Sequence, residues 1–218
     1  MSYGKMIYAV EKIRSNSTEC PDALQKKDIQ TQYPYIWAIG NLNILDRKLL
    51  GFFCSVKCPG DIILKTYDFA RAMRDKGITV ISGFHSAIEK DCLDILIKGT
   101  QPIVICPARG IENMRVPKAW KIAIESDRLL VLSPFEKKHN RVTAQLADRR
   151  NQMVALRAEN LFLPYAVLGS RSENLCNQMV KAGRKVFTFE GEASQTLTAL
   201  GAKAISIEDA KVAFKNFH

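Results

Sequence analysis

The strongest constraint on the fold is an alternation that begins at Tyr35. Short apolar runs rich in β-branched and aromatic residues alternate there with longer stretches whose apolar residues recur at helical spacing. This alternation is typical of βαβ units. Several runs lack alternating polar residues, as expected for parallel strands that helices cover on both faces. The predicted strands are Tyr35–Ile39, Leu50–Cys54, Thr79–Ile81, Pro102–Cys106, Leu129–Leu132, Leu161–Leu168, Val186–Phe189 and Ala202–Ile205.

The clearest helix lies between the second and third predicted strands. Apolar residues from Ile62 to Met73 recur at helical spacing, Asp61 is the predicted N-cap and Gly77 the stop. A strand, a Pro-Gly turn and this helix make the first mononucleotide-like unit. We therefore predict an α/β fold, a Rossmann-like three-layer αβα sandwich with a mostly parallel sheet. Further helices are predicted at Ile88–Ile97, Pro117–Ile124, Ala144–Ala158, Glu173–Ala182 and Ser194–Leu200.

The length of 218 residues suits one main domain. Residues 1–34 are polar and irregular apart from a short amphipathic stretch at Ile7–Ile13, so they are predicted to form an N-terminal extension that packs on the domain or on a partner. Residues 35–218 form the predicted domain.

The chain is basic, with 32 Lys and Arg against 22 Asp and Glu and a formal net charge of +10. This charge favours phosphates, anionic lipid or acidic partners without choosing among them. The N-terminus has no apolar signal core, and no apolar run reaches the ~18 residues that a membrane span needs. We expect a cytoplasmic protein with no membrane partner.

Cysteines give no sign of a cofactor. Cys54 and Cys58 have a spacing that suits two metal ligands, but no second Cys/His pair completes a tetrahedral zinc site. We predict no metal and no cofactor, and we interpret Cys54, Cys92 and Cys106 as buried reduced thiols.

Ligands of open parallel sheets gather where the strands end and helices begin. After the second predicted strand, Ser55, Lys57 and Gly60 offer a hydroxyl, an ammonium and a small residue immediately before a helix. This loop is predicted to hold a phosphate, although an ordinary turn with a surface lysine explains it as well.

The loop after the third predicted strand carries Ser82, Gly83 and His85. Gly83 permits close backbone approach, and the other two supply hydrogen-bonding side chains. A role for His85 as a base needs an orienting partner that the sequence does not identify, so we interpret this loop as a binding or packing element.

A basic stretch runs from Lys137 to Arg157, with Asp148 as its single acid. At its centre, Arg149 and Arg150 supply forked guanidinium groups beside the amides of Asn151 and Gln152, a set that suits phosphate oxygens and base edges. The alternative is a solvated helix face. No hydrolase, metalloprotease or Walker motif is present, so we favour binding over catalysis.

Taken in order, these segments resemble the DprA/Smf family. Residues 36–45, IWAIGNLNIL, resemble its L-Y-x-x-G-N-x-x-L-L lead-in, and residues 53–57, FCSVK, stand where it has V-G-S/T-R. Residues 80–89, VISGFHSAIE, resemble V-V-S-G-L-A-x-G-I-D, with Glu89 in place of the aspartate. Residues 149–155 resemble F-P-x-R-N-R-I-I-A with Arg150 and Asn151 kept and Gln152 for the last arginine, and residues 182–191 followed by Gly201-Ala202 resemble the closing motifs.

The resemblance spans roughly Tyr35 to Ile205 and implies a Rossmann-like core that binds single-stranded DNA and helps to load a recombinase during DNA uptake. A nucleotide-derived ligand with a sensor or phosphoribohydrolase-like activity is the alternative, although the P-G-G-x-G-T-x-x-E motif of those enzymes is missing. A third hypothesis is a scaffold that serves only protein contact, as a homodimer.

Overall fold

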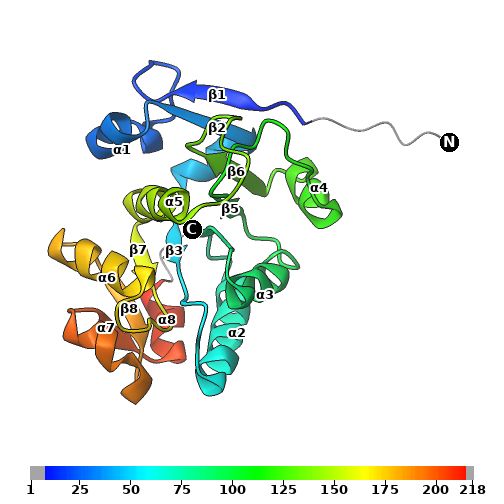
Figure 1. Cartoon of the computed structure of the whole chain (residues 1–218). Helices are drawn as coiled ribbons and strands as arrows, with labels where there is room; N and C mark the ends of the chain where they lie inside the picture. The colour runs from blue at the N-terminus through cyan, green and yellow to red at the C-terminus, as the bar shows by residue number, and fades with distance from the viewer. Residues whose placement is uncertain (1–7, 215–218) are drawn as a thin grey trace.

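In the computed structural model, which describes residues 8–214, a nine-stranded sheet forms the centre of the molecule (Figure 1). Its strands lie in the order β1-β2-β6-β5-β4-β3-β7-β8-β9; β1 and β2 are antiparallel to their neighbours and the other pairs are parallel. The strands are β1 (Glu11–Arg14), β2 (Tyr35–Gly40), β3 (Leu50–Phe52), β4 (Val80–Ser82), β5 (Ile103–Ile105), β6 (Leu129–Ser133), β7 (Asn160–Phe162), β8 (Val186–Phe189) and β9 (Lys203–Ile205).

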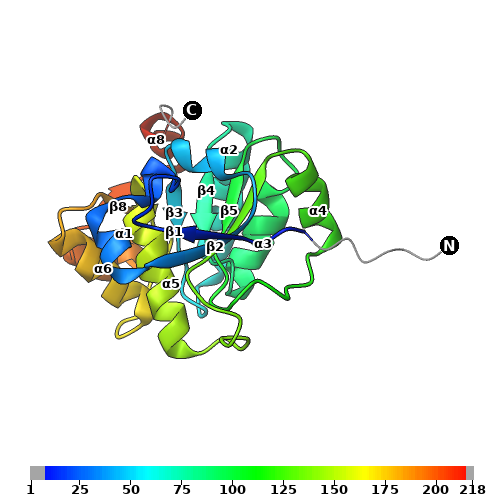
Figure 2. The ribbon, with the colours of Figure 1, turned by 90° about the horizontal axis from the view of Figure 1, so that it is seen from above.

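Helices cover both faces of this sheet, as Figure 2 shows from above. The helices are α1 (Lys27–Gln32), α2 (Gly60–Asp75), α3 (Ala87–Leu96), α4 (Lys118–Glu125), α5 (Ala144–Arg157), α6 (Arg171–Lys181), α7 (Gln195–Ala199) and α8 (Ile207–Ala213). One apolar core contains residues of α2, α3, α4 and α8, and a second contains residues of α1, α5, α6 and α7. This arrangement confirms the predicted three-layer α/β fold with a mostly parallel sheet.

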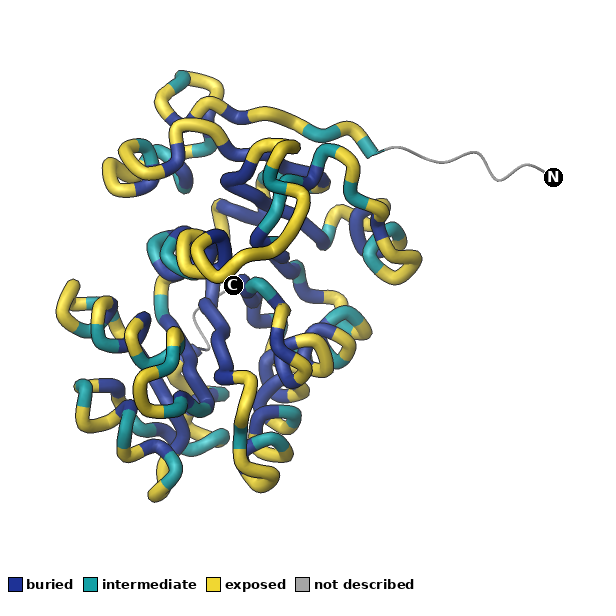
Figure 3. The backbone as a smooth tube through the Cα atoms, viewed as in Figure 1, coloured by how far each residue is buried: buried dark blue, intermediate teal, exposed yellow. Residues whose placement is uncertain are grey.

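Burial follows the layers. The central strands are buried, whereas the outer faces of the helices and the connecting loops are exposed (Figure 3). Strands β3, β4 and β5 are buried along their whole length. This explains why their sequences lack the polar alternation of a half-exposed strand.

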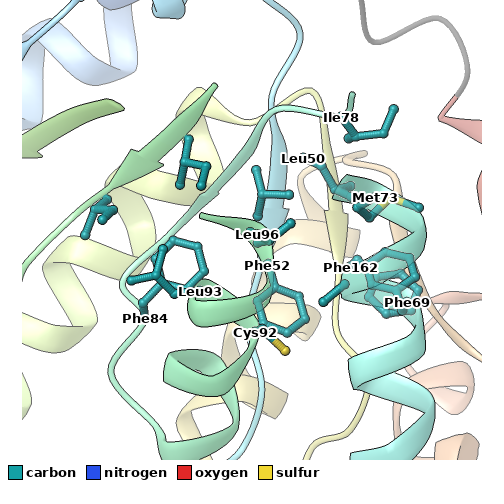
Figure 4. Packing of buried hydrophobic residues seen from close by; sticks show 14 of the residues in the cluster. Leu50, Phe52, Phe69, Met73, Ile78, Phe84, Cys92, Leu93, Leu96 and Phe162 are labelled. Atoms are coloured by element: carbon teal, nitrogen blue, oxygen red, sulfur yellow. The ribbon is translucent and has the colours of Figure 1, made fainter. Parts of the chain in front are cut away.

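Aromatic packing joins segments that lie far apart in the chain. The Phe69 ring of α2 stacks on Phe162 of β7 with centroids 3.9 Å apart, and it meets Phe189 and Phe214 edge-on at 6.0 and 6.4 Å. Figure 4 shows Phe69 and Phe162 beside Phe52 and Met73. Such rings bury large apolar areas, so this cluster ties α2 to the last third of the chain.

Several boundaries differ from the sequence-based prediction, and three of these differences involve Pro164, the turn toward α2 and a 3₁₀ turn. The strand predicted at Leu161–Leu168 ends at Phe162 because Pro164 has no N–H for a ladder bond and restricts the residue before it. The strand predicted at Leu50–Cys54 ends at Phe52, after which the chain turns toward α2. The helix predicted at Ser194–Leu200 is shorter, because a 3₁₀ turn at Glu192–Ser194 precedes α7.

Strand β1 and helices α1 and α8 were not predicted. The predicted amphipathic stretch begins at Ile7, outside the described residues, and its end belongs to β1, which pairs Ile13 with Ile36 of β2. The domain boundary at residue 34 stays a prediction. Within residues 8–214, no helix has the length and apolar character to cross a bilayer.

Candidate nucleic-acid interface

The sheet has its topological switch point at β3. This strand pairs with β4 on one side and with β7 on the other, so the chain leaves it in one direction and returns much later on the opposite side. Doubly wound sheets bind ligands in the crevice outside the carboxyl ends of such strands. The loops after β3, β4 and β7 meet there, and we refer to this place as the crevice.

The loop after β3 contains three predicted site residues. Ser55 is buried; its hydroxyl accepts a hydrogen bond from the Val167 backbone N–H at 3.2 Å and lies 3.3 Å from the hydroxyl of Ser170. Ser55 therefore joins the loops after β3 and β7. Lys57 is exposed, and Gly60, the first residue of α2, has open space around it.

Three helices begin at the crevice, and they differ in whether a side chain caps the N-terminus. The Glu89 carboxylate and the Ser86 hydroxyl form a capping box at α3. At α6, the Ser170 hydroxyl accepts from the Glu173 N–H and the Glu173 carboxylate accepts from the Gly169 N–H. At α2 the N-cap is Pro59 and not the predicted Asp61, which lies in the first turn, and no side chain caps the helix. The first-turn N–H groups of α2 therefore remain available for an anion.

Ser82 and Glu89 shape the loop after β4. Ser82 is fully buried, and its hydroxyl donates to the Phe52 carbonyl oxygen at 2.6 Å, so it holds β3 and β4 together instead of facing solvent. The Glu89 carboxylate accepts from the backbone N–H groups of Cys54 at 3.0 Å and His85 at 2.7 Å, while the His85 side chain is exposed. Sequence reasoning did not select Glu89 as a site organiser, although its spacing from Ser86 is the signature of a capping box.

Gly83 lies directly against Arg150. A Cβ atom at Gly83 would lie 1.1 Å from Arg150 Nη1, so only glycine leaves room for the guanidinium. Arg150 is 4% exposed, and its Nη1 donates to the Cys106 carbonyl oxygen at 2.9 Å. Burial lowers the pKa of Arg150, and the charge of Glu89 opposes this shift. Arg150 therefore braces α5 against the ends of β4 and β5.

The predicted basic face includes two residues that are not exposed, and for these two the prediction is wrong. Arg150 and Arg157 are buried because they lie seven residues apart on the side of α5 that carries Leu146 and Met153. The Arg157 guanidinium donates to the Arg47 carbonyl oxygen, and burial lowers the pKa of Arg157 to about 10. The exposed cations of the stretch are Lys137, Lys138, Arg141 and Arg149.

Arg149 is held at the surface by aromatic rings. Its guanidinium carbon lies 5.9 Å from the centre of the Tyr33 ring and 5.8 Å from that of Phe135. Tyr33 also donates to the Arg149 carbonyl oxygen at 2.7 Å. An exposed guanidinium placed in this way is suited to a phosphate oxygen.

Asn151 and Gln152 lie beside the crevice and not within its loops. They line a cleft of about 260 Å³ between α5 and α6, which we refer to as the α5–α6 cleft. The structure thus separates the predicted residues into exposed groups at the crevice (Lys57, Gly60, His85), an exposed cation on α5 (Arg149), buried organisers (Ser55, Ser82, Arg150, with Gly83 packed on Arg150) and the two cleft amides.

Cys54 and Cys58 interact with each other. A hydrogen bond with Cys58 and burial raise the pKa of Cys54, and the same bond lowers the pKa of Cys58. Over residues 8–214, no group of three or more His, Cys, Asp or Glu residues is placed to hold a metal ion.

Solved structures of known proteins share this architecture. Structures of DNA processing protein A are similar over nearly the whole chain: the protein from Helicobacter pylori, described for its single-stranded DNA binding mode, has a TM-score of 0.76 and 16% identity, covering 97% of this chain and 98% of that one. The protein from Streptococcus pneumoniae has a TM-score of 0.76 and 19% identity, covering 98% of this chain and 76% of that one.

A molybdenum cofactor carrier protein from Chlamydomonas reinhardtii is more distant, with a TM-score of 0.54 and 13% identity over 78% of this chain and 98% of that one. A search of curated proteins finds no significant match. The model of the family described as DNA recombination-mediator protein A matches residues 12–217. As its resemblance to DprA/Smf proteins predicted, the chain belongs to the DNA recombination-mediator protein A family.

Proposed function

We propose that this protein binds single-stranded DNA, with a phosphate of the strand at the N-terminus of α2 and neighbouring phosphates on Lys57 and Arg149. The observation that carries the proposal is the uncapped α2 N-terminus. Of the three helices that begin at the crevice, α3 and α6 use a carboxylate of their own, whereas α2 begins without a side-chain cap and next to exposed Lys57.

Charge supports a polyanionic ligand. The chain carries a formal net charge of +10, and exposed cations extend from the crevice along the loop before α5. A phosphate backbone draws most of its affinity from such cations through the release of counterions. The Helicobacter pylori protein, which has the same fold, was described for binding single-stranded DNA, and this favours a single strand as the ligand.

The proposal assigns different roles to the predicted residues. Lys57, Gly60, His85 and Arg149 present the ligand-facing surface. The loops and α5 are held in place by Ser55, Ser82, Gly83 and Arg150. The polar groups of the two serines and of Arg150 form hydrogen bonds within the protein, and Gly83 packs against Arg150. We further propose a role in DNA uptake or recombination, which agrees with the family. The alternative of a nucleotide-processing enzyme is not favoured by the family match. A recombinase partner, a homodimer and a cytoplasmic location stay predictions.

The test is fluorescence anisotropy of a labelled single-stranded oligonucleotide at several salt concentrations, with Lys57→Ala and Arg149→Ala. Each variant should weaken binding and reduce the slope of log affinity against log salt by about 1, the effect of losing one phosphate contact. Lys76→Ala is the matched control, because Lys76 is an exposed lysine at the other end of the same helix. An affinity that does not change with salt, or an equal loss in Lys76→Ala, would refute the proposal.

A further inference from the structure

The loop between β3 and α2 contains a pair of thiols that the phosphate interface does not use. Cys54 and Cys58 lie on either side of a bend in the chain at Val56 and Lys57. The bend returns Cys58 to the apolar core to which Cys54 belongs, so both side chains pack on one cluster. Both thiols are free, and a hydrogen bond joins them. The folded chain therefore holds the two sulfur atoms next to each other, as a disulfide requires.

Cys58 differs from the other cysteines in its exposure. All six cysteines belong to the described part of the chain, and Cys58 is half-buried whereas the other five are buried. The residues around it are exposed, namely Val56, Lys57, Pro59 and Gly60. A dissolved reagent therefore reaches the Cys58 sulfur without unfolding of the chain.

The surroundings of Cys58 favour its thiolate. Cys58 follows exposed Lys57 and directly precedes Pro59, the N-cap of α2, where no side chain caps the helix. A hydrogen bond with Cys54 lowers the pKa of Cys58, and burial and the charge of Asp61 oppose this shift. The thiolate is the form that attacks disulfides. Cationic surroundings also attract anionic reagents, among them glutathione.

Four other cysteines lie in less reactive surroundings. Burial raises the pKa of Cys20, Cys92, Cys106 and Cys176, so these thiols stay protonated at neutral pH. A buried, protonated thiol reacts slowly with dissolved reagents. Reaction of the folded protein should therefore begin at Cys58.

We propose that Cys54 and Cys58 form a reversible disulfide site, closed by a small disulfide of the glutathione class and reopened by a small thiol. In the first step, the Cys58 thiolate attacks one sulfur of oxidised glutathione. The S–S bond of that molecule breaks, a mixed disulfide forms on Cys58, and one glutathione leaves as its thiolate. In the second step, Cys54 releases its proton to solvent and its sulfur attacks that of Cys58, which expels the second glutathione as a thiolate. Both leaving thiolates take protons from solvent, so the protein dithiol is oxidised and oxidised glutathione is reduced.

The two thiols have different roles in this reaction. Cys58 attacks first because the reagent reaches it, and buried Cys54 resolves the mixed disulfide. A hydrogen bond with Cys58, burial and the charge of Cys58 raise the pKa of Cys54. The Cys58 sulfur carries no charge once it belongs to a mixed disulfide, so Cys54 then loses its proton more easily. The inference does not depend on the proposed function, because it concerns the thiols alone.

The experiment treats the folded protein with oxidised glutathione at neutral pH, stops the reaction with acid and measures the intact mass. The product should have lost the mass of a hydrogen molecule, and dithiothreitol should restore the original mass. Trypsin cleaves after Lys57, between the two cysteines, so the oxidised protein should give peptides 49–57 and 58–65 joined by the disulfide. The reduced protein should give the same peptides separately.

Variants separate the roles of the two thiols. Cys54→Ala leaves Cys58 without its resolving partner, so this protein should gain the mass of one glutathionyl group and react no further. Cys58→Ala removes the accessible thiol and should slow the reaction at least about tenfold, because buried thiols remain. Cys92→Ala is the matched control, because it removes a buried thiol of the same core and should leave disulfide formation unchanged. Circular dichroism checks that each variant folds, and the tryptic peptides of the unchanged protein test the site without any variant.

The outcomes are distinct. Joined peptides 49–57 and 58–65, formed only when Cys58 is present, support the site. The inference is wrong if the unchanged protein keeps its mass, if glutathione stays on Cys58 without a bond to Cys54, or if Cys54 pairs with another cysteine. These measurements contain no DNA, so their failure leaves the proposed function standing, and a failure of DNA binding leaves the disulfide site standing.

Discussion

The contact between Gly83 and Arg150 makes a quantitative prediction about Gly83→Ala. The new Cβ would lie 1.1 Å from Arg150 Nη1 and 1.8 Å from Cζ. Because the obstacle is the end of a flexible side chain, the guanidinium moves and the backbone stays. The movement breaks the 2.9 Å hydrogen bond to the Cys106 carbonyl oxygen, and hydrogen bonds to charged groups contribute about 1.5–3 kcal/mol.

The backbone at Gly83 does not oppose the change, because Gly83 is absent from the glycines with positive φ. Replacing such a glycine by alanine stabilises a protein by about 0.4–1 kcal/mol through the unfolded chain. Gly83→Ala alone should therefore lower the free energy of unfolding by about 1–2 kcal/mol. In an Arg150→Met background, with no guanidinium to displace, the same change should be neutral or stabilising.

The measurement is a double-mutant cycle by urea unfolding at neutral pH, followed by circular dichroism. We expect a coupling free energy of about 2 kcal/mol between the two positions, which is typical of residues in contact. An equal cost of Gly83→Ala in both backgrounds would show that Arg150 does not set the requirement for glycine.

Two further predictions concern buried groups. Glu89→Gln should lower the free energy of unfolding by about 1–3 kcal/mol in urea denaturation, because the carboxylate accepts from three backbone N–H groups and an amide NH₂ cannot accept. The control is Asp94→Asn, which changes an exposed carboxylate of the same helix and should have little effect. Equal costs of the two changes would contradict the role assigned to Glu89. Burial raises the pKa of Tyr33 to about 12 from 10.0, so the unfolded chain loses this proton at lower pH than the folded chain. The contribution of Tyr33 to the free energy of unfolding is therefore fully present below pH 10 and is lost between about pH 10 and 12. Tyr33→Phe should therefore make alkaline destabilisation shallower by at most about 2.7 kcal/mol, measured as unfolding free energy against pH, whereas a profile that matches the unchanged protein would refute this role.

Local periodicity was enough to predict the sheet from β2 to β9 but not its edge strand β1. The buried strands β4, β5 and β6 are apolar apart from a final serine in β4 and in β6. In contrast, Glu11–Arg14 contains only one apolar residue and becomes β1 because it pairs with the edge of β2. The strand was predicted to run from Leu161 to Leu168 because this stretch is mostly apolar, and the prediction did not take into account that Pro164 has no N–H for a ladder bond. Strand order, with β7 beside β3, depends on long-range packing that no local pattern records.

The site, like the sheet, could be predicted where local sequence decides the structure and could not where long-range packing does. Lys57 and Gly60 could be predicted from their place after a strand, because that position decides which loop meets the crevice. Neighbouring Arg149 and Arg150 both matched a basic surface, yet adjacent helical residues point in different directions, and the apolar positions Leu146 and Met153 place Arg150 inward. The α5–α6 cleft requires two helices that are adjacent only in the folded chain, so its α6 amides had no signal in the sequence.

The place of β3 in the sheet also sets an order of assembly during synthesis. Its partner β7 follows it by more than a hundred residues along the chain, and Phe162, on which the Phe69 ring stacks, also lies in β7. Until residues 160–162 leave the ribosome, one edge of β3 has no partner strand. Unpaired strand edges and uncovered apolar rings promote association between nascent chains. A nascent chain that ends before Asn160 therefore presents this unpaired strand edge and this uncovered ring to other chains.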